Sequence, residues 1–241
     1  MSLEAARDRR YRVAVRVAAL YDIHGNASAL EAVLADVRGS GAELIVVGGD
    51  VVEGPLPVET LELLDAVVMP LVWVRGNCDR DPSEWVRERV GEERVAWLAG
   101  LPTTVAIDVD GLGAVCFCHG SPRSDEDIVT AVSSVARVEP MLDGVDEDMV
   151  VSGHTHVQFD RVVANRRLVN AGSVGMPYQG ESGWAYWTMF GPTVEHGRSA
   201  FDADALTTAL RESGYPNPEW FEPESAEHAA AEYEQMAQEQ H

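Results

Sequence analysis

The first third of the chain constrains the fold most, because continuous apolar segments alternate there with segments of helical periodicity. Residues 13–20 are almost entirely apolar and predict a strand buried on both faces. Asn26 is a capping residue, and the apolar residues after it recur at helical spacing until Gly39. A second strand, a second helix and a third strand are predicted at 44–47, 60–68 and 71–74. Repetition of this kind predicts parallel strands joined by crossover helices.

The second half of the chain is richer in strands. Residues 104–109 and 114–118, separated by a turn, predict a β-hairpin. Further short strands are predicted at 149–151, 157–163, 168–170, 184–190 and 193–201. We therefore expect two packed sheets flanked by helices, in one domain that spans residues 1–201.

Residues 202–241 are predicted to form a separate acidic tail, which contains ten Asp or Glu residues and one Arg. Helices are predicted at 204–213 and 224–240. Trp220 and Phe221 are expected to dock the tail on the core. A helical tail in contact with solvent is the favoured interpretation, and a lid or an oligomer contact is the alternative.

The charge of the chain excludes several functions. Its 40 Asp and Glu residues outnumber 18 basic residues, all of them Arg, and give a formal net charge of −22. A chain without lysine has no P-loop lysine, Schiff base or lysine general base. Nothing resembles a basic surface for extended nucleic acid or an anionic membrane. With three cysteines, no signal peptide and no apolar run near the roughly 20 residues of a membrane span, a cytoplasmic protein is expected.

Five short polar segments follow predicted strands, at the edge of an α/β sheet where functional sites are built. They are Asp22-Ile23-His24, Gly48-Gly49-Asp50, Gly76-Asn77-Cys78-Asp79, Cys118-His119-Gly120 and Gly153-His154-Thr155-His156. In an extended segment, Asp22 and His24 leave the same face and can reach one ion. Imidazole nitrogens mixed with carboxylate and amide oxygens suit Mn, Fe, Zn, Ni or Co better than Ca or Mg.

Each segment alone also has an ordinary structural explanation. An Asp-x-His pair is more often a helix cap or a hydrogen-bonded core histidine than a metal site. Asn77 after a glycine is typical of a turn. Cys116 and Cys118 are expected to pack in the core rather than bind metal. The order and spacing of all five segments together are far more specific.

Together the segments resemble the calcineurin-like metallophosphoesterase superfamily, over roughly residues 12–200. The sequences at 22–26, 75–79 and 170–175 look most like its small bacterial and archaeal phosphodiesterase branch. The resemblance implies an α/β fold, a four-layer αββα sandwich of two mixed β-sheets flanked by helices. It also implies a hydrolase acting on ester bonds.

The resemblance further implies a binuclear centre of two divalent metal ions. The implied ligands comprise three for the first ion, three for the second and one that bridges both: Asp22, His24 and His156; Asn77, His119 and His154; and Asp50. Manganese is the favoured metal, with Fe, Zn, Ni and Co as alternatives. A hydroxide that bridges the two ions would then attack phosphorus.

One position departs from the superfamily pattern. Most members carry a histidine after Gly-Asn that is thought to protonate the leaving group, whereas Cys78 follows Asn77 here. A similar cysteine occurs in the small phosphodiesterase branch. A thiol with a pKa near 8.5 is a poor acid at neutral pH, so we expect good leaving groups to be favoured. The alternative is a small residue that lines the pocket. Asp50 and His119 complete the implied catalytic set.

Candidate contacts for the substrate phosphate lie beside the motifs. Arg75, Arg80 and Arg123 have the planar guanidinium that binds phosphate, with surface salt bridges as the alternative role. Ser173 lies in the glycine-rich segment 170–177, which is predicted to contact phosphate or to support the metal ligands.

The predicted function is hydrolysis of a small phosphodiester. The alternatives are a phosphomonoesterase, a dinucleoside-polyphosphate hydrolase, or a non-catalytic scaffold like the retromer subunit of the superfamily. The predicted partner is a small phosphoester, with no extended nucleic acid and no membrane. The sequence leaves open the natural substrate, the metal and whether the chain forms a homo-oligomer.

Overall fold

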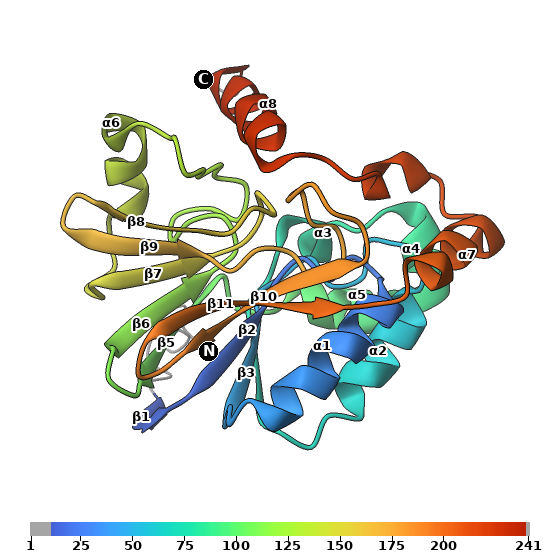
Figure 1. The fold of residues 1–241 in the computed structure, drawn as a ribbon, viewed down its shortest axis with the longest axis horizontal. Helices are drawn as coiled ribbons and strands as arrows, with labels where there is room; N and C mark the ends of the chain where they lie inside the picture. Colours follow the sequence, from blue (N-terminus) through green and yellow to red (C-terminus); the bar gives the residue numbers. More distant parts are fainter. Residues whose placement is uncertain (1–10, 240–241) are drawn as a thin grey trace.

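Two mixed β-sheets pack face to face in the computed structural model, which describes residues 11–239 (Figure 1). The six-stranded sheet has the order β1 (Tyr11–Val15), β5 (Thr104–Val109), β6 (Gly113–Cys118), β7 (Met149–Ser152), β9 (Arg166–Asn170), β8 (Phe159–Val163). The five-stranded sheet has the order β11 (Val194–Ala200), β10 (Trp184–Phe190), β2 (Val17–Leu20), β3 (Leu44–Val47), β4 (Leu71–Trp73). Both sheets combine parallel and antiparallel pairs, as predicted.

Helices cover the outer faces of the two sheets. The five-stranded sheet packs against α1 (Ala27–Gly39), α2 (Pro57–Asp65), α4 (Glu84–Val90) and α5 (Glu92–Ala99). The six-stranded sheet packs against the short α6 (Val135–Val138) and η2 (Glu139–Leu142). The remaining helices are α3 (Asn77–Arg80), α7 (Ala203–Ser213), η3 (Pro218–Phe221) and α8 (Ala226–Glu239). The predicted sandwich of two sheets flanked by helices is confirmed.

The core between the sheets follows from the alternation of side chains along buried strands. In β2, Val17 and Ala19 face the other sheet, whereas Ala18 and Leu20 face the helices, and all four are fully buried. This two-sided burial explains why the segment is continuously apolar. The carboxyl ends of β2 and β3 lead directly into two of the polar segments.

The predicted strand 13–20 is in fact two strands, because the chain changes sheets at Arg16. β1 pairs with β5 in one sheet, and β2 pairs with β3 and β10 in the other. The carbonyl of Val15 accepts the N–H of Asp110, whereas the carbonyl of Arg16 accepts the N–H of Glu43. The prediction of one strand was wrong because an apolar run does not show which partner each residue pairs with.

Several other elements differ from prediction only at their ends. α2 begins at Pro57 rather than at residue 60, since proline is well suited to a first helical turn. The hairpin of β5 and β6 is confirmed. Helices α4 and α5 were not predicted. Cys116 and Cys118 lie in the core beneath α6, as expected.

Between residues 11 and 239, no helix is both long enough and apolar enough to cross a membrane.

Asn26 ties the first helix to the loop after β9, and its loss should destabilise the fold. Its side-chain oxygen accepts the N–H of Ala29 at 3.1 Å and its amide donates to the carbonyl of Gly175 at 2.9 Å. Asn26→Ala removes the cap and leaves a buried carbonyl unpaired, so we expect a loss of about 2 kcal/mol in the free energy of unfolding. Urea denaturation measures it.

Asn26→Ser is the matched control, because its hydroxyl can still cap the helix while the amide donor is removed without adding a charge. Its destabilisation should be smaller than that of Asn26→Ala. An Asn26→Ala protein as stable as the wild type would contradict this account.

Candidate metal centre

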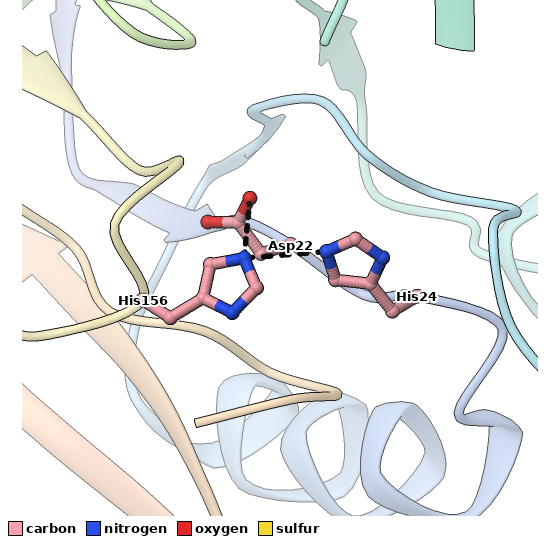
Figure 2. Close-up of side chains that lie close together, drawn as sticks. All are labelled: Asp22, His24 and His156. Atoms are coloured by element: carbon pink, nitrogen blue, oxygen red, sulfur yellow. Dashed lines mark hydrogen bonds and ion pairs between the residues drawn. The ribbon is translucent and has the colours of Figure 1, made fainter. Parts of the chain in front are cut away.

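The structure brings the polar segments of both sheets to one place. Six predicted metal ligands form two groups, and the ligand atoms within each group lie within 4.8 Å of one another. The groups are Asp22, His24 and His156 (Figure 2), and Asp50, His119 and His154. The seventh predicted ligand, Asn77, places its side-chain oxygen 3.1 Å from Nε2 of His119.

Backbone carbonyls orient three of the four imidazoles. In each of the three, Nδ1 donates to a carbonyl oxygen, so Nε2 faces the centre and can bind an ion when it carries no proton. The carbonyl partners are Glu53 for His24 at 3.0 Å, Gly48 for His119 at 2.9 Å and Met176 for His156 at 2.7 Å.

The first group contains buried polar atoms that lack suitable protein partners. Nε2 of His24 and Nε2 of His156 lie 3.3 Å apart, and both carry lone pairs when the rings are neutral (Figure 2). Oδ1 of Asp22 is buried without a hydrogen-bond partner, 3.4 Å from Nε2 of His156. Unpaired buried acceptors are costly, and a cation between them removes the cost. The donor set therefore fits a divalent transition metal.

Without a metal, the charges of the centre are strongly coupled. Burial alone would raise the pKa of Asp22, but His156 and His119 lower it below its ordinary value. Burial lowers the pKa of His119, but Asp50 and Asp22 raise it to about 10. Burial and His119 lower the pKa of His154 to about 4. The two carboxylates thus favour the protonated form of His119, whereas His154 is favoured in its neutral form.

The backbone is strained at the predicted ligands. Five of them have positive φ angles, which side-chain-bearing residues rarely adopt. The angles are 52° at Asp22, 48° at His24, 54° at Asp50, 63° at His154 and 57° at His156. Outliers of this kind concentrate at functional sites because they aim side chains that a regular strand would point elsewhere.

Two glycines permit the loops of the centre to touch. A Cβ on Gly76 would lie 2.1 Å from Oδ1 of Asp50, and a Cβ on Gly54 would lie 1.7 Å from the carbonyl oxygen of His24. Either position would force the backbone apart if it carried a side chain.

Asp79 holds two of these loops together, a role that the sequence did not reveal. It is fully buried, and its carboxylate accepts the N–H groups of Asp50 at 2.8 Å, Val51 at 2.9 Å and Gly76 at 3.0 Å. Burial and the nearby Asp50 raise its pKa to about 6. The only signal was its place two residues after Asn77 in the motif.

Cys78 lies beside the second group. Its N–H donates to Oδ1 of Asp50 at 2.8 Å, and its sulfur accepts from the amide of Asn77 at 3.5 Å. Burial and the carboxylate of Asp50 raise the pKa of the thiol well above its ordinary value. The thiol therefore keeps its proton at neutral pH.

The predicted phosphate contacts already have protein partners. Arg75 and Arg80 pair with Asp125, and Arg123 pairs with Asp127. Their role in binding phosphate stays a prediction.

Ser173 is buried, and its hydroxyl forms hydrogen bonds with two backbone groups. Its hydroxyl donates to the carbonyl of Asp22 and accepts the N–H of Met176, both at 2.8 Å. These bonds support the segment that carries Asp22, and a contact between Ser173 and phosphate stays a prediction.

Two tyrosines outside the five polar segments pack against the histidines. The ring of Tyr178 stacks on that of His156, with 4.9 Å between centroids and 24° between planes. The hydroxyl of Tyr233, from α8, donates to the carbonyl of His154 at 3.2 Å. Nothing local in the acidic tail indicated that Tyr233 would reach this centre.

Metal binding should release protons. His119 carries a proton on Nε2 at neutral pH because its pKa is raised to about 10. A metal ion bound at this atom must displace that proton, so the affinity of the metal-free protein for Mn²⁺ should rise about tenfold per pH unit between about pH 6 and 9. Calorimetric titration in two buffers of different ionisation enthalpy measures the release. An affinity that does not change with pH would contradict the assignment of this atom.

Comparison with known proteins identifies the family. The calcineurin-like phosphoesterase superfamily domain matches residues 15–189. Phosphodiesterase YfcE of Escherichia coli K12 is 39% identical over 173 residues, which cover 66% of this chain and 79% of that protein.

Solved structures agree with this match. The metallophosphoesterase from Sphaerobacter thermophilus is 26% identical with a TM-score of 0.66, over 85% of this chain and 96% of that one. The hypothetical protein PH1004 from Pyrococcus horikoshii OT3, at 20% identity, shares the fold with a TM-score of 0.72, over 86% of this chain and 96% of that one. The chain therefore belongs to the calcineurin-like phosphoesterase superfamily and is a metal-dependent phosphoesterase.

Proposed function

We propose that the protein is a phosphodiesterase that hydrolyses small phosphodiesters at a binuclear metal centre. The observation that carries the proposal is the pair of ligand groups, in which inward-facing imidazoles meet two buried carboxylates and Oδ1 of Asp22 has no hydrogen-bond partner. The name of the E. coli relative, a phosphodiesterase, supports the same reaction. A small substrate accords with an acidic chain, because the metal ions would supply the positive charge.

The two groups suggest how the ions would be shared. One ion would be held by the first group and the other by the second group together with Asn77. Asp50 is suited to bridge both, since its Oδ2 lies 3.3 Å from Nε2 of His119 and 3.9 Å from Nε2 of His24. Manganese is the favoured metal, with Fe, Zn, Ni and Co as alternatives.

The chain's own residues prepare the centre for an anionic substrate. When bound, two divalent ions act as Lewis acids on phosphoryl oxygens and make hydroxide available at neutral pH. Asp79 fixes the backbone of Asp50 and Gly76, and Ser173 fixes the backbone at Asp22. These bonds hold the ligands in place before the substrate arrives. A cytoplasmic location and a domain boundary at residue 201 also stay predictions.

Cys78 should limit the range of leaving groups. Since its thiol is held protonated with a high pKa, it is a weak proton donor to an alkoxide. We predict that Cys78→His raises kcat about tenfold for alkyl phosphodiesters and changes kcat little for nitrophenyl esters, which leave without protonation. Cys78→Ser is the matched control and should not improve either substrate. Equal effects of His and Ser would remove Cys78 from this role.

A matrix of metals and substrates tests the proposed reaction. With Mn²⁺, bis-p-nitrophenyl phosphate should be hydrolysed faster than p-nitrophenyl phosphate. His119→Ala should reduce the rate about 100-fold or more because it removes a metal ligand. His228→Ala, which removes an exposed imidazole outside the centre, should leave the rate unchanged.

Each other outcome of the matrix selects a different function. Preference for the monoester would favour a phosphomonoesterase. Faster hydrolysis of dinucleoside polyphosphates than of either nitrophenyl ester would favour a dinucleoside-polyphosphate hydrolase. Absence of hydrolysis with every metal would favour the non-catalytic scaffold.

A further inference from the structure

The acidic C-terminal segment crosses the metal centre between two anchors. The first is Tyr215, which is 3% exposed and donates its hydroxyl to Oε1 of Glu53 at 3.1 Å. Glu53 is itself buried, and its carbonyl oxygen orients His24. The segment is thus tied to a residue that directly contacts the first ligand group.

The second anchor is Glu234 in α8. Its Oε1 accepts from the hydroxyl of Thr130 at 2.8 Å, the hydroxyl of Ser133 at 2.5 Å and the guanidinium of Arg137 at 2.5 Å. Thr130 and Ser133 are buried, so this part of the β6–β7 connection is a polar socket that receives one carboxylate. The socket lies next to the loop of His154 and His156, because the hydroxyl of Thr155 donates to the carbonyl of Val129.

Tyr233 precedes Glu234, so the second anchor fixes its position. Its hydroxyl lies 3.2 Å from the carbonyl oxygen of His154, and its ring centroid lies 6.4 Å from those of His154 and Tyr178. Tyr178 in turn stacks on His156. Figure 1 shows α8, in red, above the loops at this end of the two sheets.

The centre needs hydrogen-bond donors for a phosphoryl group. The chain contains no lysine, and the three arginines beside the motifs each pair with an aspartate. A tyrosine hydroxyl is protonated at neutral pH and donates strongly to an anionic oxygen. Its present acceptor is a neutral carbonyl, and rotation about the C–O bond of Tyr233 would turn the O–H toward an anionic oxygen bound nearby.

We propose that Tyr233 is a substrate-binding residue, whose hydroxyl donates a hydrogen bond to a phosphoryl oxygen at the metal centre while Glu234 holds α8 in place. The proposal rests on the proposed function for the location of the phosphoryl group. It assigns an active-site role to a segment outside the matched family domain, which ends at residue 189. The neighbouring rings of Tyr178 and Tyr233 would also restrict the size of the substrate to small phosphoesters.

Binding of inorganic phosphate to the Mn²⁺-loaded full chain tests the hydrogen bond without relying on turnover. Tyr233→Phe keeps the ring and removes the hydroxyl, so calorimetry should show affinity reduced about 10-fold or more. Metal content, measured by atomic absorption, should be unchanged. Glu227→Gln, an exposed change on the same helix, is the control and should bind phosphate like the wild type.

Glu234→Ala tests the anchor separately. Amide hydrogen exchange in residues 226–239 should become faster, and phosphate affinity should fall as it does in Tyr233→Phe. A Tyr233→Phe protein with a lower melting temperature but unchanged phosphate affinity would overturn the proposal, since its role would then be structural. So would unchanged phosphate affinity in a Glu234→Ala protein whose α8 exchanges faster.

The two proposals can fail independently. If the wild type prefers monoesters yet Tyr233→Phe weakens phosphate binding, the phosphodiesterase proposal is wrong and the role of Tyr233 stands. If the wild type hydrolyses diesters and Tyr233→Phe leaves phosphate affinity unchanged, the phosphodiesterase proposal stands and the role of Tyr233 in binding substrate is wrong.

Discussion

The rest of the structure depends on one constraint, which is that buried imidazole nitrogens and a carboxylate oxygen are held together within reach of one cation. Nε2 of His24 and Nε2 of His156 lie 3.3 Å apart because each ring donates its other nitrogen to a backbone carbonyl. Beside them, Oδ1 of Asp22 is buried without a hydrogen-bond partner. Buried acceptors without partners lower the stability of the protein unless a cation binds between them. Five of the predicted ligands also have positive φ angles, and strain of this kind is typical of functional sites.

The packing of the two sheets brings these acceptors together. The five-stranded sheet supplies Asp22, His24 and Asp50 at the ends of parallel strands, and the six-stranded sheet supplies His119 and the loop of His154 and His156. Hydrogen bonds cross between the sheets at this end: the N–H of His154 donates to Oδ2 of Asp22 at 3.0 Å. Neither sheet alone contains a complete group of predicted ligands, so both groups form only when the two sheets pack together.

Much of this could be predicted because local patterns encode it. The capped helix after Asn26 and the hairpin of β5 and β6 follow from periodicity and turn chemistry. The predicted ligands stand in short motifs whose order is informative from the sequence alone. The six predicted ligands lie in two clusters, and their role as metal ligands stays a prediction.

The remainder depends on contacts between distant residues. The change of sheet at Arg16 is set by the partners Glu43 and Asp110, which an apolar run cannot reveal. Asp79 gains its role only when two loops meet, and Tyr233 only when α8 docks through Glu234. In each case the residue type is compatible with an ordinary surface or turn. Tertiary structure alone gives it a function.

The most direct measurement is X-ray diffraction from crystals soaked in Mn²⁺, with anomalous differences collected at the manganese edge. The account predicts two anomalous peaks, roughly 3.5–4 Å apart. One should lie among Asp22, His24 and His156, and the other among Asn77, His119 and His154, with Asp50 between them. A single peak, or peaks outside these groups, would contradict the binuclear centre.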